Sequence, residues 1–227
     1  MASLSAPEPP STVSIWQSLL SLLLADPAKV LTLVDALGRR IGSLVQSAGS
    51  YEVLEHDIRL ELLDAYGHQA VYSKRQQVRF LQNNVIAYQD QAWGDGDIFV
   101  DYQCSPGVAV DRYREGHRYS ILISLRKTMN RGDQEEFHIQ RRIEDGFTKP
   151  IEDFQAEVNH PMRHLTISVI FPPERLSKRC WLVEQNTRRT LALNGEHFTI
   201  LSDQRLQVTW QTDKPRLFET YILLWEW

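Results

Sequence analysis

From about residue 51 to residue 227, the sequence alternates between apolar and polar residues with a period of two. Ile58, Leu60 and Leu62, for example, alternate with charged residues, and residues 119–125 repeat the pattern. Successive side chains of a β-strand point to opposite faces, so this period lines one face of a strand with apolar groups. The alternation therefore predicts half-buried β-strands and argues against a helical domain.

About a dozen short runs of this kind are separated by turn residues, without a strand–helix–strand rhythm or a glycine-rich phosphate loop. Short strands with frequent turns are typical of sandwiches and barrels. We therefore predict that residues 51–227 form a mainly β domain, an antiparallel β-sandwich of jelly-roll or Greek-key type. The expected strands begin near residue 58 and continue near 70–81, 85–90, 98–104, 108–113, 119–125, 135–143, 154–158, 165–171, 181–184, 190–193, 198–201, 206–210 and 218–227.

The alternation also predicts which side chains face the core. In the strand near 135–143, the residues expected to face inward are Phe137, Ile139 and Ile143. In the strand near 70–81, the charged residues expected on the solvent side are Lys74, Arg75 and Arg79. The last strand is expected to lie inside a sheet because of its aromatic residues, which include Tyr221, Trp225 and Trp227.

Residues 13–48 differ from the rest because their apolar residues recur at helical spacing. Asp26 suits a helix N-cap and Pro27 suits the first helical position, so we expect one or two short helices interrupted there. The apolar stripe of the second helix steps by four and three residues, which indicates an amphipathic helix. Its members are Val30, Val34, Leu37, Ile41 and Leu44. The preceding residues 1–12 are polar and proline-rich, and we expect them to be disordered.

The apolar stripe of residues 13–48 has three interpretations. It packs on its own domain, it binds a protein partner or a second copy of the chain, or it lies on a membrane surface with Trp16 and Leu23 inserted. In layout alone, an amphipathic segment ahead of an aromatic-rich β domain is similar to actinoporin-like pore formers. The apolar run is too short to span a bilayer and lacks a basic leader, so we expect a soluble, cytoplasmic protein.

Charge and cysteine usage narrow the classes of partner. The formal net charge is -4, and basic residues are interleaved with acidic ones instead of forming a stripe. This pattern argues against nucleic acid as a partner. Cys104 and Cys180 lack metal-binding spacing, which favours two thiols in a reducing compartment, with a single disulfide as the alternative. No cofactor is predicted.

The strongest candidate for a binding surface is the turn at residues 93–97, which reads Trp-Gly-Asp-Gly-Asp. Carboxylates beside glycines can hold calcium, but a full set of ligands is missing, so we interpret Asp95 and Asp97 mainly as residues that shape the turn. Trp93 lacks such an explanation, because a tryptophan on a loop is typical of a surface that binds a partner or a sugar.

A second candidate is the stretch at residues 112–119, where basic and aromatic residues are interleaved. Arg112 and Arg114, next to Tyr113, could hold a phosphate or a stacked ring. The alternative is an ordinary solvated strand face, since acidic residues interrupt the stretch.

The motifs of common catalytic and metal sites do not occur in this sequence. His160 and His164 are four residues apart, but Pro161 disfavours the helix that would bring them together, so no metal site is predicted. No nucleophile elbow is present and neither cysteine has a recognisable histidine partner. Whether the protein is an enzyme stays open at this point, with the balance against it.

The favoured hypothesis for function is a non-catalytic β-sandwich module for recognition or assembly. Its helical segment would mediate self-association or partner binding, and the residues at the Trp93 turn would contact the partner. One alternative is a membrane-active protein that uses the amphipathic helix. Another is a jelly-roll protein, either an enzyme or a binder of a small ligand or carbohydrate, with its site at the Trp93 turn.

Overall fold

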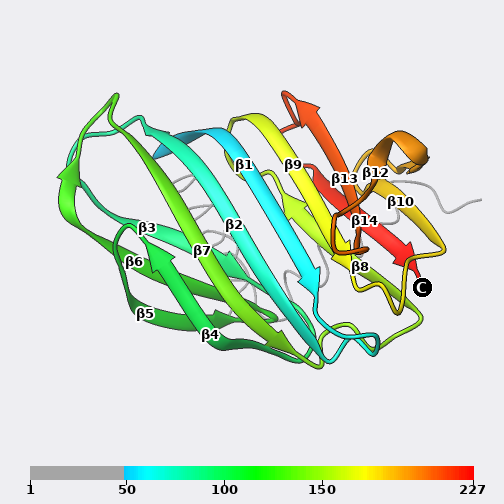
Figure 1. The fold of residues 1–227 in the computed structure, drawn as a ribbon. Coiled ribbons are helices and arrows are strands. Elements are labelled where there is room, and N and C mark those ends of the chain that lie inside the picture. The colour runs from blue at the N-terminus through cyan, green and yellow to red at the C-terminus, as the bar shows by residue number, and fades with distance from the viewer. Residues whose placement is uncertain (1–48) are drawn as a thin grey trace, which may run out of the picture. The chain divides into compact units, whose positions relative to one another are not determined.

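Fourteen β-strands and one short 3-10 helix make up residues 49–227, the part of the chain that the computed structural model describes (Figure 1). In chain order the elements are β1 (Tyr51–Leu62), β2 (Gln69–Phe80), β3 (Val85–Ala92), β4 (Asp97–Ser105), β5 (Val108–Glu115), β6 (Arg118–Met129), β7 (Gln134–Glu144), β8 (Ile151–Glu157), β9 (Met162–Phe171), β10 (Arg179–Glu184), β11 (Arg189–Ala192), η1 (Gly195–His197), β12 (Phe198–Ile200), β13 (Leu206–Asp213) and β14 (Thr220–Glu226).

The strands form three sheets. A seven-stranded sheet has the order β12-β13-β9-β1-β2-β7-β4, a four-stranded sheet the order β11-β10-β14-β8, and a three-stranded sheet the order β3-β6-β5. Figure 1 shows the long strands β1, β2, β7 and β9 running side by side across the domain. The three-stranded sheet lies toward the β4 end of the large sheet and the four-stranded sheet toward the β13 end.

Both smaller sheets pack against one face of the seven-stranded sheet, which we call the inner face. On the three-stranded side, Tyr88 of β3 stacks on Phe137 of β7 with ring centroids 4.0 Å apart. On the four-stranded side, Trp225 of β14 packs edge-on against Phe171 of β9 at 5.6 Å. The hydrophobic core therefore lies between the large sheet and its two covers, as the burial of large apolar side chains favours.

The prediction of a mainly β domain is confirmed, but the strand pairing is not purely antiparallel. β1 pairs with β9 in parallel, with Ile58 opposite Ile167. A parallel pair needs a long crossover connection, and here the chain between these strands builds β2 to β8. The expected helices of residues 13–48 and the expected disorder of residues 1–12 lie outside the described residues. Within residues 49–227, no helix is long and apolar enough to cross a membrane.

The apolar alternation predicts the buried face of most strands correctly. Ile121, Ile123 and Leu125 of β6 are buried, and so are the three expected residues of β7. Trp225 of β14 and the following Trp227 are also buried, and both rings pack against Phe171 of β9, at 5.6 and 6.2 Å. Both cysteines are free thiols, Cys104 on β4 and Cys180 on β10.

Lys74 contradicts its predicted place on the solvent side. The alternation of β2 continues through residue 74, so this side chain points inward and is only 8% exposed. Its Nζ donates hydrogen bonds to Asp90 Oδ1 at 2.9 Å and to the Tyr88 hydroxyl at 2.8 Å. Tyr102 in turn donates to Asp90 Oδ2 at 3.1 Å. Burial opposes the charged form of Lys74, but the charge of Asp90 and the Tyr88 hydroxyl hold its pKa well above the ordinary value.

The buried pair of Lys74 and Asp90 gives a test of the packing between β2 and β3. Lys74→Met leaves Asp90 buried without a counterion and should lower the free energy of unfolding by about 3–5 kcal/mol. The double variant Lys74→Met/Asp90→Leu removes both charges and should lose clearly less than the two single variants combined. Urea unfolding of all three variants measures this coupling. Additive losses would show that the two charges do not stabilise each other.

His160 gives a prediction about acid stability. Its ring stacks on Tyr51 at 4.0 Å, and burial, followed by the charge of Lys74, lowers the pKa of His160 to about 4. In the unfolded chain this histidine binds its proton near pH 6.5. The contribution of neutral His160 to the free energy of unfolding is therefore complete above that pH, and it declines as the pH falls toward about 4. His160→Phe keeps a stacked ring and should lose less stability than the wild type over this range. If the wild type and His160→Phe lost the same amount of stability between pH 6.5 and about 4, the assignment of the lowered pKa to His160 would be wrong.

Candidate functional site

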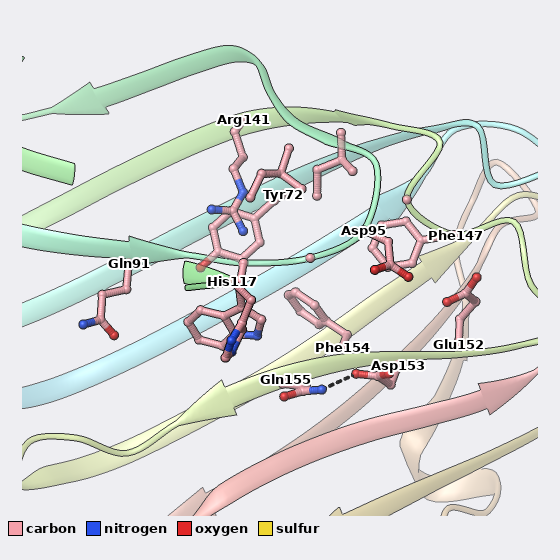
Figure 2. A pocket seen from close by; sticks show the side chains of 15 residues that line it. Tyr72, Gln91, Asp95, His117, Arg141, Phe147, Glu152, Asp153, Phe154 and Gln155 are labelled. Atoms are coloured by element: carbon pink, nitrogen blue, oxygen red, sulfur yellow. Dashed lines mark hydrogen bonds between the residues drawn. The ribbon is translucent and has the colours of Figure 1, made fainter. Parts of the chain in front are cut away.

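A cavity of about 280 Å³ lies beside Trp93, where both smaller sheets meet the inner face of the large sheet (Figure 2). Its lining comes from β2, β3, the β3–β4 turn, β4, the β5–β6 turn, β7, the β7–β8 link and β8. The lining residues are Tyr72, Gln91, Trp93, Gly94, Asp95, Ile98, His117, Arg141, Ile143, Gly146, Phe147, Glu152, Asp153, Phe154 and Gln155.

The cavity has a buried floor and an exposed rim. Tyr72 and Arg141 are buried on neighbouring strands of the inner face, where their backbones pair across β2 and β7. Asp95, His117 and Asp153 are exposed. The cavity therefore opens to solvent through residues of the turns and of β8, while its floor belongs to the rigid sheet.

Glycines shape the turn that carries Trp93. Gly94 and Gly96 have φ values of 146° and 71°, which residues with a Cβ rarely adopt. Asp97 Oδ1 accepts a hydrogen bond from the backbone N–H of Phe99 at 3.1 Å. The interpretation of Asp97 as a residue that shapes the turn therefore matches its contact. At Gly96, an added Cβ would lie 2.0 Å from the carbonyl oxygen of Glu144, so the turn rests directly on the end of β7.

Trp93 is held at the cavity by a charged neighbour. The guanidinium of Arg118 lies over the Trp93 ring, 4.9 Å from its centroid. Arg118 also forms an ion pair with Glu157 of β8. A guanidinium over an indole face is a favourable cation–π arrangement. Trp93 is thereby linked to both smaller sheets, which positions its ring as one wall of the cavity.

Arg141 is the unusual residue of the floor. Its side chain is 5% exposed, and its guanidinium lies over the Tyr72 ring at 4.2 Å and near the Phe99 ring at 6.0 Å. Figure 2 shows the side chain leaving β7 and ending over Tyr72. The Nε and Nη1 atoms are buried, and no described residue accepts a hydrogen bond from either atom. The ring contacts provide no hydrogen-bond acceptor in the ring plane, so these N–H donors stay without an acceptor among the described residues.

The carboxylates of the cavity have other partners. Asp95 pairs with the ammonium group of Lys149, and Glu152 Oε1 accepts a hydrogen bond from the Lys149 backbone N–H at 2.6 Å. Burial raises the pKa of Glu152. Asp153 accepts from the Gln155 amide at 2.6 Å. Figure 2 shows these carboxylates on the side of the cavity away from Arg141.

The structure brings together only some of the residues that the sequence marked as binding candidates. Trp93 and Asp95 line the cavity, whereas Asp97 lies in the turn next to it. Arg112 lies over the Phe99 ring at 4.5 Å, and Arg114 lies over Tyr119 at 5.4 Å. Neither arginine lines the cavity.

The candidate residues for self-association or membrane contact lie outside the described residues. They are Trp16, Leu23, Val30, Val34, Leu37, Ile41 and Leu44.

The sequence contained a signal for Arg141 that was not used. Arg141 occupies an inward position in the alternation of Phe137, Ile139 and Ile143. A charged residue in an inward series is unusual and indicates either a buried partner or a binding site. The residues of β8 that line the cavity gave no comparable signal, because their place depends on how the sheets assemble.

Other polar groups carry less chemistry. His164 pairs with Asp213 at 2.7 Å, apart from the stacked His160. Among the described residues, no cluster of His, Cys, Asp and Glu could hold a metal ion.

A second hollow of about 610 Å³ lies on the outer face of the large sheet, between side chains such as Arg59 and Gln103. Aromatic side chains do not line this hollow, so it offers less for holding a ligand than the cavity beside Trp93.

Comparisons with known proteins leave the chain without a family. No family model matches it, and no curated protein matches it in sequence. Among solved structures, it is similar to a putative protease from Parabacteroides distasonis, with 10% identity and a TM-score of 0.48 over 79% of this chain and 41% of that one. It is also similar to an M1 zinc metallopeptidase from Deinococcus radiodurans, with 10% identity and a TM-score of 0.43 over 77% of this chain and 42% of that one. The chain thus spans about two fifths of either structure, and these likenesses assign no function.

The close contact at Gly96 gives a test of how the turn shapes the cavity. Gly96→Ala and Gly116→Ala both place a Cβ at a positive φ, which costs about 1–2 kcal/mol. At Gly116 the added Cβ meets no described atom within 4 Å, whereas at Gly96 it collides with the β7 backbone. We therefore expect Gly96→Ala to lower the free energy of unfolding clearly more than Gly116→Ala, in urea titrations of both variants. Equal losses would show that the turn does not rest on β7.

Proposed function

We propose that this protein is a non-catalytic recognition module and that the cavity beside Trp93 is its binding site. The observation that carries the proposal is the combination of an aromatic wall and a buried, unpaired guanidinium in one solvent-accessible cavity. Small-ligand sites are typically concave and mostly apolar, with a few polar groups that fix the orientation of the ligand.

The side chains at the cavity support binding more than catalysis. Its lining, which lies wholly within the described residues, contains no serine, threonine, cysteine or lysine that could act as a nucleophile. His117 at the rim has no hydrogen-bonded carboxylate among the described residues to orient it as a general base. The cavity carboxylates accept hydrogen bonds from neighbouring groups. This set can hold and orient a ligand.

The kind of partner follows from the size of the cavity. About 280 Å³ falls just below the usual range for drug-sized ligands, so the cavity suits a small molecule or a single side chain of a partner protein. The hypotheses of self-association and of membrane contact depend on residues 13–48, which the structure does not describe. They stay predictions, as does the cytoplasmic location.

Trp93→Ala tests the proposed site directly. We would screen the full-length protein against a library of small acids, amines and neutral aromatic compounds by ligand-observed NMR. Compounds that bind the wild type should lose most of their affinity for Trp93→Ala, because the substitution removes one wall of the cavity.

The matched control is Trp181→Ala, which removes another partly exposed tryptophan that does not line the cavity. Ligands should bind this variant as they bind the wild type. Binding that survives Trp93→Ala unchanged, or a library without any ligand, would contradict the proposal.

A further inference from the structure

Two cations are buried on the inner face of the seven-stranded sheet, and they differ in their partners. Lys74 on β2 has the carboxylate of Asp90 and the hydroxyl of Tyr88 within hydrogen-bonding distance. Arg141 on β7 is buried to a similar extent, but no described residue provides an acceptor for its Nε and Nη1. A buried charge normally has a partner, because its desolvation is otherwise uncompensated. Arg141 therefore lacks an anion that its surroundings require.

Resting on the proposed function, we propose that the cavity binds a compact carboxylic acid, with the carboxylate on the Arg141 guanidinium and an apolar group against the aromatic lining. Arginine is well suited to this role, because its fixed N–H donors match the oxygens of a carboxylate. Tyr72 and Phe99 lie against the guanidinium and hold it in place, and neither ring provides an acceptor for its N–H donors.

The remaining lining selects the size and polarity of the ligand. An apolar cavity of about 150 Å³ is large enough for benzene, so about 280 Å³ accommodates a ring with a short chain that ends in a carboxylate. Phe147 and Phe154 line the cavity together with Trp93 and provide apolar surface for the ring. Aromatic side chains favour flat apolar groups in this way.

The cavity favours a carboxylate over a phosphate. Asp95, Glu152 and Asp153 also line it, so its net charge does not favour a second negative charge on the ligand. A phosphate monoester carries a charge of about -1.5 to -2 near neutral pH, whereas a carboxylate carries a single charge. The repulsion from the lining carboxylates is therefore stronger for the phosphate.

Three matched ligands that share a phenyl group separate the contribution of the charge to binding from that of the apolar group. With full-length protein, we would measure the binding of 3-phenylpropanoate, 3-phenylpropanamide and 2-phenylethyl phosphate by NMR titration. 3-Phenylpropanoate should bind about ten- to a hundredfold more tightly than the amide, because only the acid gives Arg141 a charged acceptor. The phosphate should bind more weakly than the acid.

A free acid and the C-terminal carboxylate of a peptide share this chemistry. A tetrapeptide Gly-Gly-Gly-Phe, as the free acid and as the C-terminal amide, distinguishes these sources. A preference for the acid in both pairs would assign the cavity to peptide termini as well as to small acids. A preference in the phenylpropanoate pair alone would restrict it to small acids.

Arg141→Met should abolish the preference for the acid, and Arg141→Lys should reduce it. The matched control is Arg142→Met on the same strand, where the exposed side chain lies on the outer face and the preference should persist. Equal binding of 3-phenylpropanoate and its amide, with both lost in Trp93→Ala, would overturn the inference and leave the proposed function standing. Failure of both compounds to bind, or tighter binding of the phosphate, would also overturn the inference.

The stability of Arg141→Met gives an independent readout. If Arg141 has no hydrogen-bonded or charged partner in the free protein, its replacement by an apolar side chain should leave the midpoint of urea unfolding unchanged or raise it. A decrease as large as that of Lys74→Met would show that Arg141 has a structural partner, and it would overturn the inference.

Discussion

The need to compensate buried charge connects the interior of this domain with its candidate site. The inner face of the seven-stranded sheet carries Lys74 and Arg141, and both are nearly excluded from solvent. Lys74 is compensated by Asp90 of the three-stranded sheet, and this contact helps to fix that sheet on the large one. Arg141 points to the region where the three-stranded and four-stranded sheets leave a cavity between them. One cation therefore serves the packing of the domain, and the other is left available for an anion from outside.

The cavity follows from the division of the covering layer into two sheets. A single cover would have buried the whole inner face, whereas two smaller sheets leave a seam over β2 and β7. The β3–β4 turn closes part of this seam, because Gly96 lets the backbone approach the end of β7, and Trp93 of the same turn forms one wall of the cavity. Arg118 links the Trp93 ring to Glu157 of β8. The walls of the site are thus held by elements of all three sheets, which favours a largely preformed shape.

Local pattern was enough to predict most strands and their buried faces, because a period of two is imposed by the backbone of each strand. It was not enough for the sheet order, since the parallel pairing of β1 with β9 depends on residues far apart in the chain. Lys74 was wrongly predicted to face solvent because its charge suggested exposure, although it occupies an inward position in the alternation of β2. Trp93 was marked as a candidate from its turn alone, and it lines the cavity. Arg141 could have been recognised as a charged member of an apolar series, but its lack of an acceptor is visible only in three dimensions.

A crystal structure of the full-length protein with 3-phenylpropanoate would test the central claim most directly. We predict that a carboxylate oxygen lies about 2.7–2.9 Å from a guanidinium nitrogen of Arg141, the usual distance for a charge-assisted hydrogen bond. The phenyl ring should lie against the aromatic side chains of the cavity. The claim that Arg141 binds the carboxylate of an external ligand would be contradicted by a ligand bound elsewhere. It would also be contradicted if Arg141 turned away from the cavity to pair with a carboxylate of the protein.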